Sequence, residues 1–217
     1  MAASTDAREV LLSRVITYAA AGGIAGRSLR EIAAGAGTSH RMLLYHFGSR
    51  EGLMAAIVQV IEARQRADMT ALTATAGTPR GVMSGLWEQV SSPELRPFVR
   101  LFFEVVGQAV QGAPGTEALL ASLTQPWLEQ ASTAAVHMGQ STDPAALRLG
   151  VAVTRGLLLD LAAGADEAEV RASYERFMDL LEAASPPPEP APSQPAAPTG
   201  RGRGPSPAAQ RATRRPR

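Results

Sequence analysis

The sequence predicts an all-α fold, and three observations support that prediction. Aromatic residues make up only 5% of the 217 residues, and β-branched residues do not cluster, which argues against a β-sheet protein. Apolar residues recur every three or four positions in most of residues 1–184, as amphipathic helices require. Residues that stop and start helices, such as Gly22-Gly23 and Asp143-Pro144, separate these periodic segments.

Three short helices are predicted at the N-terminus, in a helix-turn-helix arrangement. The first has apolar residues at helical spacing from Leu11 to Ala19. Asp6 and Glu9 are placed for a capping box at its start, and Gly22 is placed to end it.

The next two helices each begin at a serine. Ser28 and Glu31 have the spacing of a capping box, which predicts a helix over about 29–36. After a break, Ser39 can cap a third helix over about 40–47. The break between them has the length of the turn in a helix-turn-helix unit.

The third helix has two chemically different faces. At 100° per residue, Leu43 and Phe47 lie nearly in line and are expected to face the other two helices. Tyr45 lies opposite them, with Arg41 and Met42 on either side. A face with arginine and tyrosine and no acid suits the DNA major groove, because Arg can donate two hydrogen bonds to guanine. A short surface helix with one arginine is the alternative interpretation.

The rest of the folded chain is predicted to be helical as well. Helices are expected at about 50–68, 78–91, 93–111, 116–138, 143–163 and 166–184, with a kink at Pro126 in the fourth of these. In the helix over 143–163, Leu147, Val151, Thr154 and Leu158 share one face. The last two helices are therefore candidates for a dimer interface.

Charge divides the chain into three regions. Residues 1–50 have six arginines against three acids (net +3), residues 51–184 have nine against sixteen (net −7), and residues 185–217 have six against one (net +5). The basic ends suggest a polyanionic partner. Ten of the 33 residues from 185 onward are proline. Such a segment cannot bury enough apolar surface to fold, so a disordered tail is expected.

Residue types that the chain lacks exclude several kinds of chemistry. It has no cysteine, only three histidines, and arginine at all 21 basic positions. Thiolate catalysis, cysteine-bound metals, lysine-dependent phosphate loops and Schiff bases are therefore excluded. Arg100 and Glu104 are most simply a salt bridge between successive helical turns. We expect no enzyme, no cofactor and no metal site.

Localisation follows from hydropathy. No apolar run approaches the roughly 20 residues that span a bilayer, and the first residues lack the pattern of a signal peptide. A cytoplasmic protein with no membrane partner is expected.

Residues 8–53 resemble the DNA-binding domain of the TetR family of bacterial transcriptional regulators. The matching residues are Leu11-Leu12, Val15-Ile16, Gly23, Ser28-Leu29-Arg30-Glu31-Ile32-Ala33, Ala36-Gly37-Thr38-Ser39, Leu43, Tyr45-His46-Phe47, Ser49-Arg50-Glu51 and Leu53. The resemblance implies a DNA-binding domain over residues 1–50 and a helical domain for effector binding and dimerisation over residues 51–184. Residues 185–217 form the tail.

The resemblance also implies which residues contact DNA. They are Ser28, Ser39, His40, Arg41, Tyr45, His46 and Arg50. Ser28 would bind phosphate at a helix N-terminus, and the start of the third helix would contact bases. Three positions depart from the family pattern, and one of them is Thr38, which occupies a position where valine is usual. Leu44 replaces a tyrosine that often contacts the DNA backbone, and Arg41 occupies a position where small residues are common. A structural role as a partly buried histidine is the alternative for His46.

Bulky residues of the second domain are candidates for an effector pocket. They are Met83, Trp87, Phe98, Phe102, Phe103, Trp127 and His137. Ordinary core packing explains each of them singly, and the resemblance favours a cavity for the group. A homodimer is expected because one recognition helix reads too few base pairs, whereas two related by a two-fold axis read a palindrome.

The sequence therefore predicts a homodimeric regulator, most simply a repressor, that binds double-stranded DNA and an unknown small apolar effector. One alternative is an effector-independent or architectural DNA-binding protein aided by its basic tail. Another is a helical small-molecule binder or enzyme with a vestigial N-terminal domain. In the tail, the segment 200–205 resembles an AT-hook, and a basic tail attracted to any phosphate is the alternative there.

Overall fold

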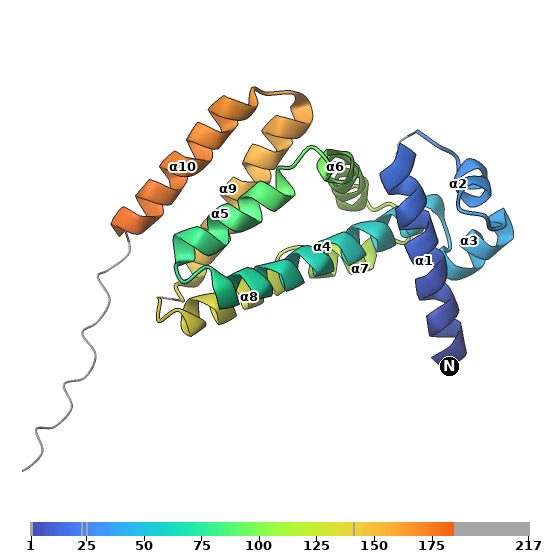
Figure 1. The fold of residues 1–217 in the computed structure, drawn as a ribbon. Coiled ribbons are helices and arrows are strands. Elements are labelled where there is room, and N and C mark those ends of the chain that lie inside the picture. Colours follow the sequence, from blue (N-terminus) through green and yellow to red (C-terminus); the bar gives the residue numbers. More distant parts are fainter. Residues whose placement is uncertain (1, 23, 25, 141, 185–217) are drawn as a thin grey trace, which may run out of the picture. The chain divides into compact units, whose positions relative to one another are not determined.

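The computed structural model describes residues 2–22, 24, 26–140 and 142–184, and this part of the chain is helical without strands (Figure 1). The helices are α1 (Ala2–Gly22), α2 (Leu29–Gly35), α3 (His40–Phe47), α4 (Arg50–Thr75), α5 (Pro79–Val90), α6 (Arg96–Val110), α7 (Glu117–Ser122), α8 (Gln125–His137), α9 (Pro144–Ala163) and α10 (Glu167–Ala184). The all-α prediction is confirmed. The tail, including the segment 200–205, lies outside the described residues.

The serine caps of the helix-turn-helix unit form as predicted. Ser28 accepts a hydrogen bond from the backbone N–H of Glu31 (3.3 Å), and the Glu31 carboxylate accepts one from the N–H of Ser28 (2.7 Å). Ser39 accepts one from the N–H of Met42 (3.2 Å). The cap predicted at Asp6 is wrong, because α1 already begins at Ala2 and Asp6 lies inside it.

A first hydrophobic core joins the N-terminal helices to α4, α6 and α7. It includes Val15, Ile32 and Leu43 from the first three helices and Leu101 and Leu119 from α6 and α7. The boundary expected at residue 50 falls at the first residue of α4. Because this core continues across that boundary, the helix-turn-helix unit and the start of α4 are packed as one body.

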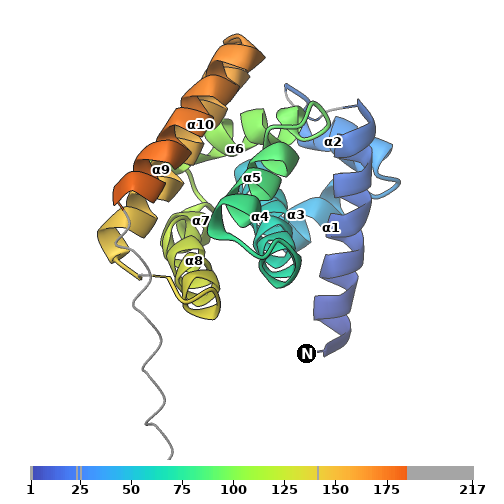
Figure 2. The same cartoon turned by 60° about the vertical axis from the view of Figure 1, so that its left-hand side comes forward.

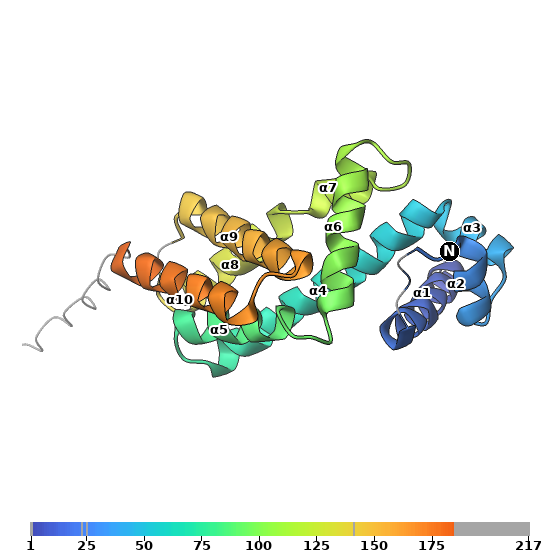
Figure 3. The same ribbon diagram turned by 90° about the horizontal axis from the view of Figure 1, so that it is seen from above.

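Helix α4 is the longest helix of the described chain and runs along α5 and α8, while α6 packs across it (Figures 1 and 3). Its end was predicted near residue 68, but it continues to Thr75. No glycine or proline interrupts residues 69–76, and Met69 is buried in the second core. Gly77, with φ +66°, provides the break.

A second core holds the other end of the molecule together. The rings of Trp87 and Tyr174 stack with centroids 4.4 Å apart, and the Tyr174 hydroxyl donates to the carbonyl of Met83 (2.9 Å). Helices α9 and α10 lie side by side (Figure 2). Arg80 at the start of α5 joins that helix to α10 through ion pairs with the carboxylates of Glu175, Asp179 and Glu182.

The helix predicted over 116–138 is two helices. α7 ends at Ser122 and α8 begins at Gln125, so the kink predicted at Pro126 is replaced by a break just before it. Proline has no N–H to donate and a φ that suits the first turn, so it starts a helix more easily than it continues one. No helix in the described residues is long and apolar enough to cross a membrane.

Candidate functional site

Helix α3 exposes the face that the helical wheel assigns to DNA. Leu43 is fully buried and Phe47 is 8% exposed, whereas the Tyr45 side chain is 75% exposed. Arg41 and Met42 are exposed beside Tyr45. The predicted orientation of α3 is therefore confirmed, and a cationic and an aromatic side chain project together from it.

The other predicted DNA contacts cluster around α3. Ser28 and Ser39 are exposed at the first turns of α2 and α3, where their hydroxyls serve as caps, and their helix N-termini can offer N–H groups to phosphate. His40 and His46 are half-buried at the two ends of α3. The His46 ring packs edge-on against Tyr45, with centroids 4.9 Å apart. These residues are brought together on one unit, as expected.

Arg50 is placed differently from the other predicted contacts. Its side chain is 22% exposed. Nε donates to the carbonyl of Arg27 (3.1 Å), and Nη1 lies 3.4 Å from Oε1 of Glu104 on α6. Glu104 thus pairs with Arg50 across the fold, and the pairing expected with Arg100 is not formed.

In the described part of the chain, the residues predicted for an effector pocket are divided between the two hydrophobic cores and the surface. Trp87 is buried in the second core, and Met83 and Trp127 pack against that core. Phe98 and Phe102 pack against the first core instead. Phe103 packs edge-on against Phe102, and His137 is exposed at the end of α8. These seven residues are thus shared between two cores and the surface.

A buried charged cluster lies between the two cores, and sequence reasoning missed it. Glu62 on α4 is 7% exposed, and its carboxylate accepts hydrogen bonds from Nε1 of Trp127 (3.1 Å) and from Arg155 on α9 (3.2 Å). Arg155 lies over the ring of Phe102 (5.4 Å), and Arg66 lies over the ring of Trp127 (5.6 Å). The feature of the sequence that could have predicted this cluster is Glu62, an acidic residue on the apolar side of α4.

Burial raises the pKa of the Glu62 carboxyl above its ordinary value of 4.5, although Arg155 and Trp127 oppose that shift. The folded protein therefore holds this proton more tightly than the unfolded chain does. The resulting stabilisation is complete below pH 4.5 and is lost as the pH rises through the folded-state pKa.

The Glu62→Gln variant has no carboxyl group to titrate at this position, so its stability should not show this decrease. The free energy of unfolding of the wild type, relative to that of the variant, should therefore decline as the pH rises. Urea unfolding at several pH values measures the difference, and a constant difference would contradict it.

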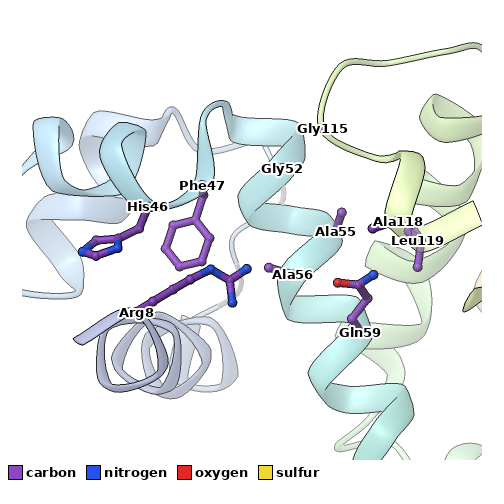
Figure 4. Close-up of a pocket in the computed structure, with 10 residues that line it drawn as sticks. All are labelled: Arg8, His46, Phe47, Gly52, Ala55, Ala56, Gln59, Gly115, Ala118 and Leu119. Atoms are coloured by element: carbon purple, nitrogen blue, oxygen red, sulfur yellow. The ribbon is translucent and has the colours of Figure 1, made fainter. Parts of the chain in front are cut away.

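A pocket of about 150 Å³ lies between α1, α3, α4 and α7. Figure 4 shows the Arg8 side chain running under the Phe47 ring, with Ala56 of α4 on the side toward Arg8 and Ala55 and Gln59 on the side toward Leu119 of α7. The Arg8 guanidinium carbon is 5.0 Å from the Phe47 ring centroid. None of the residues predicted for the effector pocket lines this cavity.

Residues 17–57 match the family model described as bacterial regulatory proteins of the tetR family. Solved structures share this fold over most of the chain. A TetR-family regulator from Pectobacterium atrosepticum is 21% identical with a TM-score of 0.67, and covers 87% of this chain and 99% of its own. A Rhodococcus protein classed in the same family is 24% identical with a TM-score of 0.63, and covers 80% and 97%.

No curated protein matches the sequence. The fold and the exposed α3 define a helix-turn-helix protein with a helical second part. The family match covers α2, α3 and parts of the flanking helices, so residues 17–57 are similar to the helix-turn-helix domain of the tetR family of bacterial regulatory proteins.

Proposed function

We propose that this protein is a homodimeric repressor that binds a palindromic operator through α3 of each subunit and is released from it by a small, largely apolar effector. The observation that carries the proposal is the face of α3 on which Arg41, Met42 and Tyr45 are exposed. This face has no acid, so it can approach phosphate and base edges without repulsion. Ser28, Ser39, His40 and His46 would contact the flanking backbone.

An exposed stripe on α9 supports the homodimer. Its residues follow each other at intervals of four and three: Ala145, Leu149, Ala152, Gly156, Leu159 and Ala163 are all exposed. This spacing is that of a helix-pairing seam. The stripe is also symmetric about Thr154, so two antiparallel copies would place Leu149 opposite Leu159 and Ala152 opposite Gly156. Such self-complementarity is what a two-fold interface requires.

The face predicted for dimerisation lies on the other side of α9. Leu147, Val151, Thr154 and Leu158 are half-buried, and Leu158 packs against the second core. The helix assigned to the interface is retained in the proposal, but the contacting residues are those of the exposed stripe.

The effector would bind near the cluster of Glu62 and Arg155. Phe102 and Trp127, which the sequence proposes for the pocket, both lie against arginines of this cluster. The cluster joins α4 to α9, so a ligand that opens it would move α4 and the helix-turn-helix unit. To reverse operator occupancy from 99:1 to 1:99, the effector must favour the DNA-free form by about 5.5 kcal/mol.

Replacing Arg41 by alanine tests the DNA-reading role of α3. The variant should lose about 1–3 kcal/mol of binding free energy per half-site on the selected operator and tolerate any base at one position of each half-site. The measurement is binding to duplexes selected from a random library. Arg64→Ala removes the same charge from an exposed position of α4 and is the control. An equal loss on operator and random DNA would assign Arg41 to phosphate.

A second candidate function is supported by the tight packing of the predicted pocket residues, above all the stacked Trp87 and Tyr174. It is a DNA-binding regulator without an effector. The two functions differ in whether any small apolar molecule raises the melting temperature and releases DNA.

A further inference from the structure

The first turn of α4 is held against α6 and the α6–α7 loop by a set of close contacts. The Ser49 hydroxyl donates to the carbonyl of Pro114 (3.3 Å). A Cβ atom on Gly115 would lie only 3.2 Å from the Cα of Gly52, so the two backbones nearly touch. On the same turn of α4, Nη1 of Arg50 lies 3.4 Å from Oε1 of Glu104.

Glu104 is itself held in position. Its Oε1 atom accepts a hydrogen bond from Nε2 of Gln108 (3.3 Å), one turn further along α6. Glu104 is the only acidic residue of α6. The carboxylate is 35% exposed, so it faces solvent and the approach of other charges.

Arg50 has two competing uses. The resemblance assigns it to a DNA phosphate, while the structure gives it a carboxylate partner on another helix. If Arg50 leaves Glu104 for a phosphate, the ion pair is lost. If it keeps both, two anions share one guanidinium and repel each other. In either case the carboxylate of Glu104 opposes DNA binding.

We propose that Glu104 restrains DNA binding by competing with the DNA phosphate for Arg50, which makes it a positioning residue that sets operator affinity. This inference rests on the proposed function. It goes beyond that function by assigning a negative regulatory role to one carboxylate that lies outside the helix-turn-helix unit.

Glu104→Gln tests the restraint. The amide oxygen can still accept the bond from Gln108, so the local structure is preserved while the charge is removed. Operator affinity should rise about threefold to tenfold at low salt, the range expected for two exposed ion pairs in a dimer. The salt dependence should steepen by up to about two units of slope, because two arginines become available to phosphate.

Glu94→Gln is the matched control, since Glu94 is exposed just before α6 and its replacement changes the net charge equally. A Glu104→Asp variant keeps the charge but withdraws it by one methylene, and should give a smaller gain. The same substitution is also made in an Arg50→Gln background, where Glu104→Gln should change affinity no more than Glu94→Gln does. Melting temperatures show that each variant is folded.

The outcomes separate the inference from the function on which it rests. If the wild type binds no duplex from a random library at low salt, the proposed function fails. If the wild type binds and Glu104→Gln behaves like Glu94→Gln, the restraint is disproved. An equal gain with and without Arg50 would also disprove it, because the effect would then be one of general charge.

Discussion

Replacing Arg155 by alanine is expected to lower the free energy of unfolding by about 3 kcal/mol. The substitution leaves the Glu62 carboxylate, which is 7% exposed, without its cationic hydrogen-bond partner. Removing one member of a buried ion pair typically costs about 3–5 kcal/mol. The lower end is expected here because the Arg155 side chain remains 21% exposed and Trp127 still donates to Glu62.

A double-mutant cycle identifies the source of this loss. In a Glu62→Gln background a neutral amide replaces the carboxylate, so Arg155→Ala should cost much less than it does alone. Arg148→Ala removes the same side chain from an exposed position of α9 and should change stability by no more than about 0.5 kcal/mol. Urea unfolding measures all four variants. Equal costs of Arg155→Ala in both backgrounds would mean that Arg155 stabilises by packing alone.

Local sequence signals predict the helix-turn-helix unit well because its determinants are local. Ser28 and Glu31 are three residues apart, and the caps they form need no distant partner. The burial of Leu43 and exposure of Tyr45 follow from the helical period alone. For these residues, periodicity and capping specify the local structure, including which side chains of α3 are exposed.

The charged contacts could not be predicted because they join residues far apart in the chain. Glu62 and Arg155 are separated by 93 positions, and Arg50 and Glu104 by 54. The spacing rule for helices instead pairs Glu104 with Arg100, one turn away. In the structure Glu104 pairs with Arg50. Such contacts depend on how α4 packs against α6 and α9, which periodicity does not determine.

The predicted effector pocket shows a similar limit. A list of large apolar residues does not distinguish a cavity wall from a packed core, because both bury the same side chains. Trp87 illustrates the point: its stacking on Tyr174 needs a partner from α10 that only the fold provides. The exposed stripe on α9 is equally hard to predict from the sequence, because the inward face of the same helix is also apolar.

Introducing arginine at both Leu149 and Leu159 is expected to convert the proposed dimer into a folded monomer. In the described chain the two side chains are 53% and 49% exposed, so the change should leave the melting temperature of the subunit nearly unaffected. In an antiparallel pair of α9 helices, each arginine would meet an arginine of the partner subunit, and like charges would be buried together. Analytical ultracentrifugation measures the change in mass.

The same variant should lose specific DNA binding although α3 of each subunit is unchanged. A dimer holds its second α3 at a high effective concentration once the first is bound, which is worth about 10²- to 10⁴-fold in affinity. The monomer should therefore bind a palindromic operator weakly, with an affinity close to that for a single half-site. Val110→Arg introduces the same side chain at an exposed apolar position of α6 and should leave both mass and affinity unchanged. A variant that stays dimeric would refute the α9 interface, and a monomer that retains full operator affinity would refute the need for two recognition helices.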